Sequence, residues 1–192
     1  KTTLLRILAG LETPDGGTVE LDGADITALP PDRRRMGFVF QDYALFENMT
    51  VLQNVSYGLR FHPGFRGRAD RGARELLERL GLAELRDSLP ARLSGGQRQR
   101  VALARTLALN PDVILFDEPM AALDAGTRLM LQDELGQLRR EFSSTFLYVT
   151  HDQEEAFSMS DRIMVMSDGR IHQLDAPEEL LRHPADEYVR QF

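Results

Sequence analysis

The first half of the chain mixes one short helical pattern with short strand-like segments. Residues 2–9 carry apolar side chains at helical spacing, and Gly10 ends that segment. Residues 18–22 alternate between polar and apolar side chains, which predicts a half-exposed strand, and residues 36–41 predict another. From 51 to 109 the spacing becomes mostly helical, so this stretch predicts a helical insertion.

Strands and helices alternate in the remainder of the chain. Residues 113–116 and 145–150 are β-rich apolar runs, and residues 127–141 between them have helical spacing. This strand–helix–strand order predicts a parallel sheet with a crossover helix. A Ser-Asp-Gly turn within residues 162–174 predicts a hairpin, and a short helix beginning near Pro177 follows it.

Length and composition limit the classes of protein that this chain can represent. Its 192 residues, 42% of them hydrophobic, predict one α/β domain with a core at 1–50 and 110–192 and a helical subdomain at about 51–109. The net charge of −7 argues against nucleic acid as a partner, because proteins that grip phosphates normally carry a basic face. No cysteine is present, so a disulfide framework and a cysteine metal site are excluded.

Two carboxylates end the apolar strand at residues 113–116. Ligands bind at the carboxyl edge of open parallel sheets, so Asp117 and Glu118 are candidates for that site. Asp117 suits Mg²⁺, which takes one or two carboxylates together with substrate phosphates, and Glu118 could orient or deprotonate a water molecule. A solvated strand end is the alternative interpretation of this pair.

A second candidate segment begins a helix at Ser94. Ser94 and Gln97 have the spacing of a capping box, and Gly95 and Gly96 lie between them. Glycine costs helix stability, but it lets bare N–H groups approach an anion at the helix N-terminus. A flexible helix start is the alternative.

The chain begins with Lys1-Thr2, without an initiator methionine. Lysine followed by threonine at the start of an apolar helix is how a phosphate-binding loop ends, with the ammonium at the β- and γ-phosphates and the hydroxyl at Mg²⁺. We therefore expect the chain to begin partway through that loop, with its glycines upstream.

Six segments in this order resemble the motifs of ABC transporter nucleotide-binding domains, over essentially all 192 residues. They are Lys1-Thr2-Thr3 (the end of Walker A), Gln41 (the Q-loop), Leu93-Ser94-Gly95-Gly96-Gln97 (the LSGGQ signature), residues 113–117 with Glu118 (Walker B and the catalytic glutamate), Ala122-Leu123-Asp124 (the D-loop) and His151 (the switch histidine). The resemblance implies an α/β P-loop NTPase fold of the ABC type, with a RecA-like parallel-sheet core, an antiparallel β subdomain and a helical insertion.

The resemblance also implies roles for individual residues. The catalytic residues would be Glu118, His151 and Gln41. ATP would be bound by Lys1, Thr2, Thr3, Ser94, Gly95, Gly96, Gln97 and Asp124. Mg²⁺ would be bound by Thr2, Gln41 and Asp117.

Two departures from the family pattern are visible. Ala121 stands where the D-loop usually has serine, which removes a hydroxyl although Asp124 is retained. The glycines of Walker A and the upstream aromatic residue that stacks on adenine are also missing. We expect this polypeptide by itself to bind ATP weakly or not at all.

Segments at residues 29–35, 38–46 and 149–156 are similar to one importer group, whose ATPases serve polyamines, iron(III), sulfate or molybdate, and maltose-type sugars. The resemblance implies a dimer of two identical domains that sandwiches ATP and works with transmembrane permease subunits. An extracytoplasmic solute-binding protein would act indirectly, and the location would be the cytoplasmic face of the membrane.

Two alternatives belong to other classes of protein. A soluble ABC ATPase of DNA repair or chromosome maintenance would carry a long coiled-coil insertion, whereas only residues 42–92 separate Gln41 from the signature. A non-catalytic regulatory ABC subunit would usually have lost Glu118 and His151.

Several remaining residues match no motif. His62, His172 and His183 are expected to be surface or loop residues, and the run of arginines at 33–35 is expected to be solvated. The aromatic residues Phe40, Tyr43 and Phe46 are interpreted either as part of a surface that receives a permease helix or as local packing.

Overall fold

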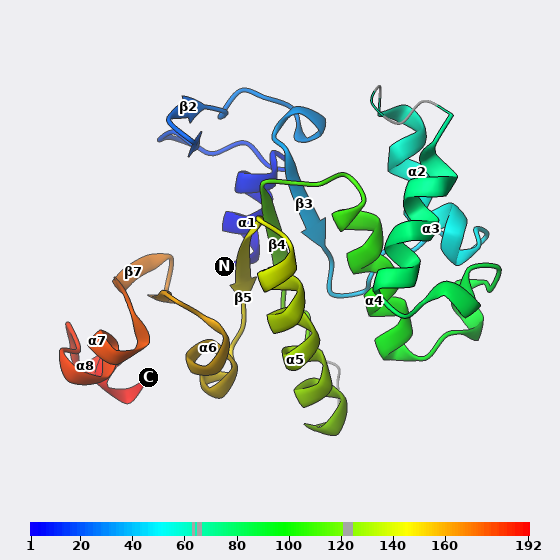
Figure 1. Ribbon diagram of the computed structural model, residues 1–192. Coiled ribbons are helices and arrows are strands. Elements are labelled where there is room, and N and C mark those ends of the chain that lie inside the picture. The colour runs from blue at the N-terminus through cyan, green and yellow to red at the C-terminus, as the bar shows by residue number, and fades with distance from the viewer. Residues whose placement is uncertain (63, 65–66, 121–124) are drawn as a thin grey trace.

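A computed structural model describes residues 1–62, 64, 67–120 and 125–192 of the chain. Its centre is a parallel three-stranded sheet in the order β3 (Met36–Val39), β4 (Val113–Asp117) and β5 (Thr145–Val149), as Figure 1 shows. The predicted parallel sheet is thereby confirmed. The strand predicted for residues 36–41 is shorter than expected, because it ends at Val39 and leaves Gln41 two positions beyond it.

The two faces of β4 pack against different helices. Ile114 and Phe116 belong to the largest hydrophobic cluster, whereas Leu115 packs with Leu5 and Ala9 of α1 (Thr2–Ala9). Successive side chains of a strand point to opposite faces, so a strand without polar residues must be covered on both sides. This arrangement explains the uninterrupted apolar run at residues 113–116.

Three helices lie together beside the edge of the sheet formed by β3 (Figure 1). They are α2 (Val51–Phe61), α3 (Ala69–Arg79) and α4 (Gly95–Leu107). Buried residues of all three helices belong to the same cluster as Phe116. Short 3₁₀ turns, outside these helices, occupy Pro31–Arg33, Ala83–Leu85 and Pro90–Arg92. The helical segment predicted between 51 and 109 therefore consists of α2, α3 and α4, while its status as a separate subdomain stays a prediction.

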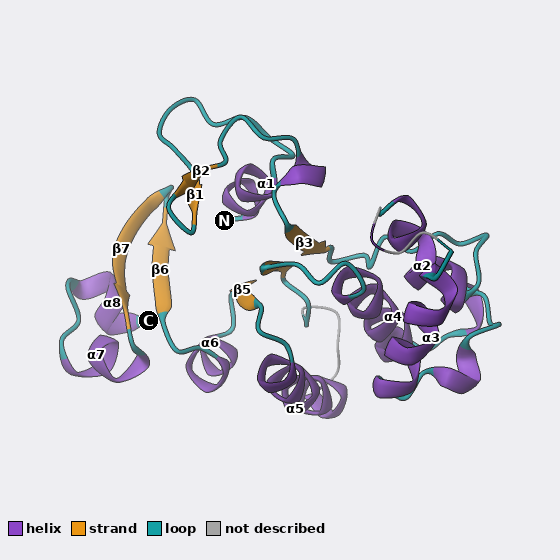
Figure 2. Cartoon of the chain, turned by 45° about the horizontal axis from the view of Figure 1, so that its top comes forward, coloured by secondary structure: helices purple, strands orange, loops and turns teal. Residues whose placement is uncertain are grey.

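Two more helices cover the face of the sheet opposite α1 (Figure 2). α5 (Ala125–Glu141) confirms the predicted crossover helix and contributes Leu131, Leu135 and Leu138 to the largest cluster. α6 (Gln153–Met159) was not expected from the sequence pattern. It begins at Asp152, whose Oδ1 accepts a hydrogen bond from the N–H of Glu155 at 3.1 Å and caps the helix.

Antiparallel pairs complete the fold. β1 (Glu20–Leu21) pairs with β2 (Ala24–Asp25), and β6 (Ile163–Ser167) pairs with β7 (Arg170–Asp175). The short helices α7 (Pro177–Arg182) and α8 (Glu187–Gln191) pack against β7 (Figure 2). The predicted hairpin is confirmed, whereas the strand predicted for residues 18–22 shrinks to two residues. Within the described residues, no helix has the length and apolar character needed to cross a membrane.

Arg34 corrects the prediction of a solvated arginine run. Its residue surface is only 3% exposed, and its guanidinium donates hydrogen bonds of 2.6–2.9 Å to four carbonyl oxygens. Two of those oxygens belong to Ile7 and Leu8, in the last turn of α1, where carbonyls lack partners within the helix. Because five donors diverge from one planar group, a single arginine can satisfy several carbonyls at once.

Candidate functional site

The carboxyl ends of the three parallel strands bring several predicted site residues to one edge of the sheet. β4 ends at Asp117 and is followed by Glu118, while β5 is followed by Thr150 and His151. Gln41 follows β3 at the same edge. This edge is where open parallel sheets bind their ligands.

The start of α1 lies at the same edge, beside the end of β5 (Figure 1). The hydroxyl of Thr2 donates a hydrogen bond to Oδ1 of Asp117 at 3.0 Å, and Nζ of Lys1 donates to the carbonyl oxygen of Thr150 at 3.3 Å. One hydroxyl and one carboxylate form a donor set that suits Mg²⁺ when phosphates and waters complete its octahedron. The exposed Lys1 ammonium is a point charge suited to phosphate, and Thr3 is exposed in the same helical turn.

Glu118 and His151 form a second contact at this edge. Nδ1 of His151 lies 3.4 Å from Oε2 of Glu118, with side chains that are 71% and 34% exposed. Glu118 adopts a left-handed backbone conformation with φ of 47°, and its N–H donates to the carbonyl oxygen of Val149 at 3.0 Å. Left-handed backbone is costly for a residue with a side chain and concentrates at functional sites. The unusual backbone conformation therefore marks Glu118 as a candidate functional residue.

Gln41 precedes a backbone turn whose carbonyl oxygens accept hydrogen bonds from Arg105 of α4. Tyr43 and Ala44 both have positive φ angles, of 65° and 44°. Arg105 donates hydrogen bonds to their carbonyl oxygens at 3.0 and 2.6 Å, and burial lowers the pKa of its guanidinium from its ordinary value. Its guanidinium carbon also lies 5.5 Å from the ring centroid of Phe46. Sequence reasoning missed Arg105, because nothing in its neighbourhood marks which carbonyls it contacts.

The predicted capping box at the start of α4 is confirmed. The N–H of Gln97 donates to Oγ of Ser94 at 3.3 Å, and the N–H of Ser94 donates to Oε1 of Gln97 at 2.9 Å. A Cβ atom added to Gly95 would meet no atom within 4 Å, so open space lies in front of this residue. Within the described part of the chain, no hydrogen bond or ion pair joins residues 94–97 to Lys1, Thr2, Asp117, Glu118 or His151.

A buried glutamine, also missed by sequence reasoning, connects α4 to the loop after Glu118. Gln99 is only 3% exposed, and its Nε2 donates to the carbonyl oxygen of Pro119 at 2.8 Å. The contact ties the helix that begins at Ser94 to the turn that follows the carboxylates. Its position two residues after the LSGGQ segment was the only available signal.

One predicted site residue cannot be placed. Asp124 lies, with Ala121, Ala122 and Leu123, outside the described residues. Its role, like the ligand roles of the other predicted site residues, remains a prediction.

His172 corrects an expectation at the other end of the molecule. It lies in β7 rather than in an exposed loop, and its ring stacks on Tyr188 with centroids 4.7 Å apart. Its Nε2 is 2.8 Å from Oγ of Ser167, and its Nδ1 is 2.5 Å from Oδ2 of Asp186. The hydrogen bond with His172, followed by that from the N–H of Val189, lowers the pKa of Asp186. These contacts attach the beginning of α8 to the hairpin.

The fold and the motif residues together define a P-loop NTPase domain of the ABC type. The family model described as ABC transporter matches residues 1–121, more than half of the chain, so the chain belongs to the ABC transporter family. Membership implies that this domain binds ATP.

Similar proteins match the chain along its whole length. A spermidine/putrescine import ATP-binding protein, PotA of Oleidesulfovibrio alaskensis, is 50% identical over 192 residues, which are 100% of this chain and 52% of the relative. A sulfate/thiosulfate import ATP-binding protein, CysA 2 of Chromobacterium violaceum, is 51% identical with the same coverage. CysA of Vibrio vulnificus is 50% identical over 196 residues, which are 100% of this chain and 57% of the relative. The chain therefore spans about half the length of these relatives.

Proposed function

We propose that this protein is the ATP-hydrolysing subunit of an ABC importer. The observation that carries the proposal is the meeting of three residue pairs at one edge of the sheet: Thr2 with Asp117, Lys1 with Thr150, and Glu118 with His151. These contacts support an arrangement in which a positive charge, a pair suited to a metal ion and a candidate base serve one phosphate-binding site. Phosphoryl transfer needs charge neutralisation and a positioned water more than covalent help from the protein.

The proposed chemistry follows from the contacts that these groups make. In hydrolysis, a water oxygen bonds to the γ-phosphorus while the bond from that phosphorus to the β–γ bridging oxygen breaks, and Glu118 accepts the proton of the water. His151 holds the Glu118 carboxylate, and the Lys1 ammonium neutralises negative charge on the phosphates. Mg²⁺, bound by Thr2 and Asp117, would supply further neutralisation, and Gln41 would orient the water and the metal shell.

A second copy of the domain would complete the site. The open space at Gly95, in the first turn of α4, supports this proposal, because a helix N-terminus attracts phosphate. A two-fold dimer would place Ser94, Gly95, Gly96 and Gln97 of each copy against the ATP held by the other, and Asp124 beside the shared site.

The transport partners follow from the names of the relatives. Proteins named for spermidine/putrescine import and for sulfate/thiosulfate import match with almost equal identity, so both solute classes are candidates, with iron(III) and sugars as further ones. We propose that the subunit binds permease subunits at the cytoplasmic face of the membrane and acts with a solute-binding protein through them.

The assigned base can be tested directly in the intact subunit. Glu118→Gln keeps the size of the side chain but removes its basicity, so we expect steady-state ATP turnover to fall by about 10²–10⁴. Phosphate release measures turnover, and size-exclusion chromatography with ATP should detect an accumulated dimer.

Glu154→Gln is the matched control, because Glu154 is an exposed carboxylate on α6 and should tolerate the same change. Undiminished turnover in Glu118→Gln would remove the assigned role. Capture of the intact subunit with a permease supports the importer, whereas capture with DNA, or wild-type protein without turnover, would contradict it.

A further inference from the structure

A hydrogen-bonded network of side chains joins the residues on the two sides of His151. The hydroxyl of Thr150 donates a hydrogen bond to Oε2 of Glu155 at 2.7 Å and accepts one from the N–H of Asp152 at 3.0 Å. The hydroxyl thus bridges the residues on both sides of His151. Restraining the backbone on both sides of His151 fixes the position of its Cα, from which the imidazole extends toward Glu118.

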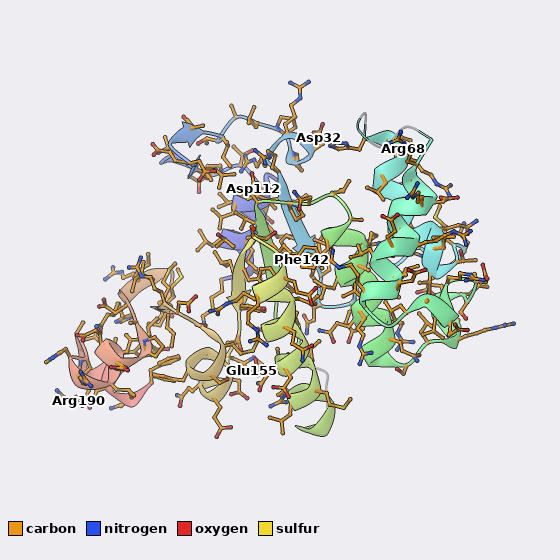
Figure 3. All side chains as sticks on the ribbon, in the orientation of Figure 1. Asp32, Arg68, Asp112, Phe142, Glu155 and Arg190 are labelled. Carbon is orange, nitrogen blue, oxygen red and sulfur yellow. The ribbon has the colours of Figure 1, made fainter. Side chains whose placement is uncertain are left out.

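Glu155, which accepts the hydrogen bond from the Thr150 hydroxyl, is largely buried. Its side chain is only 10% exposed and lies on the side of α6 that faces α5 (Figure 3). A buried carboxylate is costly unless charged or hydrogen-bonding partners compensate it. Here Nε of Arg128 lies 3.6 Å from Oε1 of Glu155, while the other carboxylate oxygen accepts from Thr150.

Arg128 connects the same network to α5. Its Nη1 donates to Oδ2 of Asp152 at 3.1 Å, so one guanidinium contacts two carboxylates of α6 and its cap. Oδ1 of Asp152 in turn accepts from the N–H of Glu155. Adjacent hydrogen bonds and ion pairs therefore couple the position of α6 to the turn at His151 and to the first part of α5.

We propose that Thr150, Glu155 and Arg128 are positioning residues that aim the His151 imidazole at Glu118. This inference rests on the proposed function, because it assigns the network to the hydrolytic site. The network touches the phosphate-binding end as well, since the Thr150 carbonyl accepts from Nζ of Lys1. None of the three positioning side chains needs to contact ATP. Their effect is to keep the His151–Glu118 distance near 3.4 Å during turnover.

Replacing the bridging hydroxyl tests the inference in the intact subunit. Thr150→Val keeps the shape and removes both hydrogen bonds, so we expect kcat to fall about 10–100-fold while KM for ATP changes less than about twofold. Thr150→Ser retains the hydroxyl and should recover most of the wild-type kcat. Thr145→Val, at the opposite end of β5, is the matched control because its side chain is exposed and remote from His151.

A spectroscopic measurement separates this inference from the proposed function. The imidazole ¹H–¹⁵N resonances of His151, assigned by their loss in His151→Ala, should shift in Thr150→Val and return in Thr150→Ser. This comparison needs no hydrolysis, so wild-type protein without ATPase activity would defeat the proposed function alone. An unchanged kcat with unmoved His151 resonances in Thr150→Val would overturn the positioning role, as would a Thr150→Ser variant as slow as Thr150→Val.

Discussion

The edge of the parallel sheet and the start of α4 carry the two sets of predicted ATP ligands, and they differ in how complete they are. At the sheet edge, side chains from α1, β4 and the turn after β5 contact one another, as Thr2 does with Asp117 and His151 with Glu118. At the start of α4, the side chains of Ser94 and Gln97 each accept a hydrogen bond from the other residue's N–H in the capping box, and open space lies before Gly95.

Within the described residues, one copy of the chain therefore brings together only part of the site that its motifs predict. Side chains at the sheet edge already contact one another in pairs. The start of α4 is a capped helix terminus with open space before Gly95. A second copy that presents its own sheet edge to this terminus would use both features.

Among changes at the start of α4, the largest loss of activity is expected when the open space at Gly95 is filled with charge. Gly95→Asp fits the fold, because its Cβ meets no atom and an acid in the first helical turn favours the helix dipole. The carboxylate would repel an incoming phosphate, so we expect ATPase activity of the intact subunit to fall by about 10²–10³ while the melting temperature stays unchanged.

A mixing experiment makes that result decisive. In a dimer formed from Gly95→Asp and Glu118→Gln subunits, one site pairs an intact Glu118 with an intact start of α4. Mixing should therefore restore hydrolysis that neither variant has alone. Failure of complementation in proven mixed dimers would show that the two regions do not meet across copies.

An effect of intermediate size on ATP turnover is expected when the side chain that caps α4 is removed. The cap of α2 provides a matched control. Thr50 caps α2 with Gln53 in the same geometry in which Ser94 caps α4 with Gln97. Ser94→Ala and Thr50→Ala should each lower the free energy of unfolding by about 1 kcal/mol, measured by urea denaturation. Only Ser94→Ala should also lower ATP turnover. Equal losses of turnover in both variants would reduce the start of α4 to a structural role.

The smallest effect, a change in the pH dependence of stability, is expected at Asp186, which belongs neither to the sheet edge nor to the start of α4. Hydrogen bonding by His172 lowers the pKa of Asp186 from its ordinary value of 3.8. A carboxyl group with a lowered folded-state pKa stabilises the fold above its unfolded pKa, and that contribution is lost as pH falls through the folded pKa. Asp186→Asn should therefore flatten the decline of thermal stability below about pH 4, without changing turnover at neutral pH. A decline as steep as in the wild-type protein would contradict the assignment.

Much of the fold was predictable because its elements depend on local patterns. The apolar run at residues 113–116, the capping box at Ser94 and the hairpin at Ser167 each have a signal within a few residues. Helix α6 was missed because its seven residues carry a mixed polar pattern, and its cap at Asp152 follows directly on a strand end. The strand at 18–22 was overestimated because its pairing is limited to the two residues of β2.

The sequence by itself determined the family, the order of the motifs and the edge at which Asp117, Glu118 and His151 meet, since parallel strands bring their carboxyl ends together. Only the tertiary structure decided what surrounds them. Arg34, Arg105, Gln99 and Glu155 act mainly on backbone oxygens or on side chains of other elements, and those partners have no sequence signature. A sequence motif indicates which residues contact the ligand. A polar side chain that positions such a residue has no motif, because its hydrogen-bonding partner lies far away in the sequence and is known only from the folded structure.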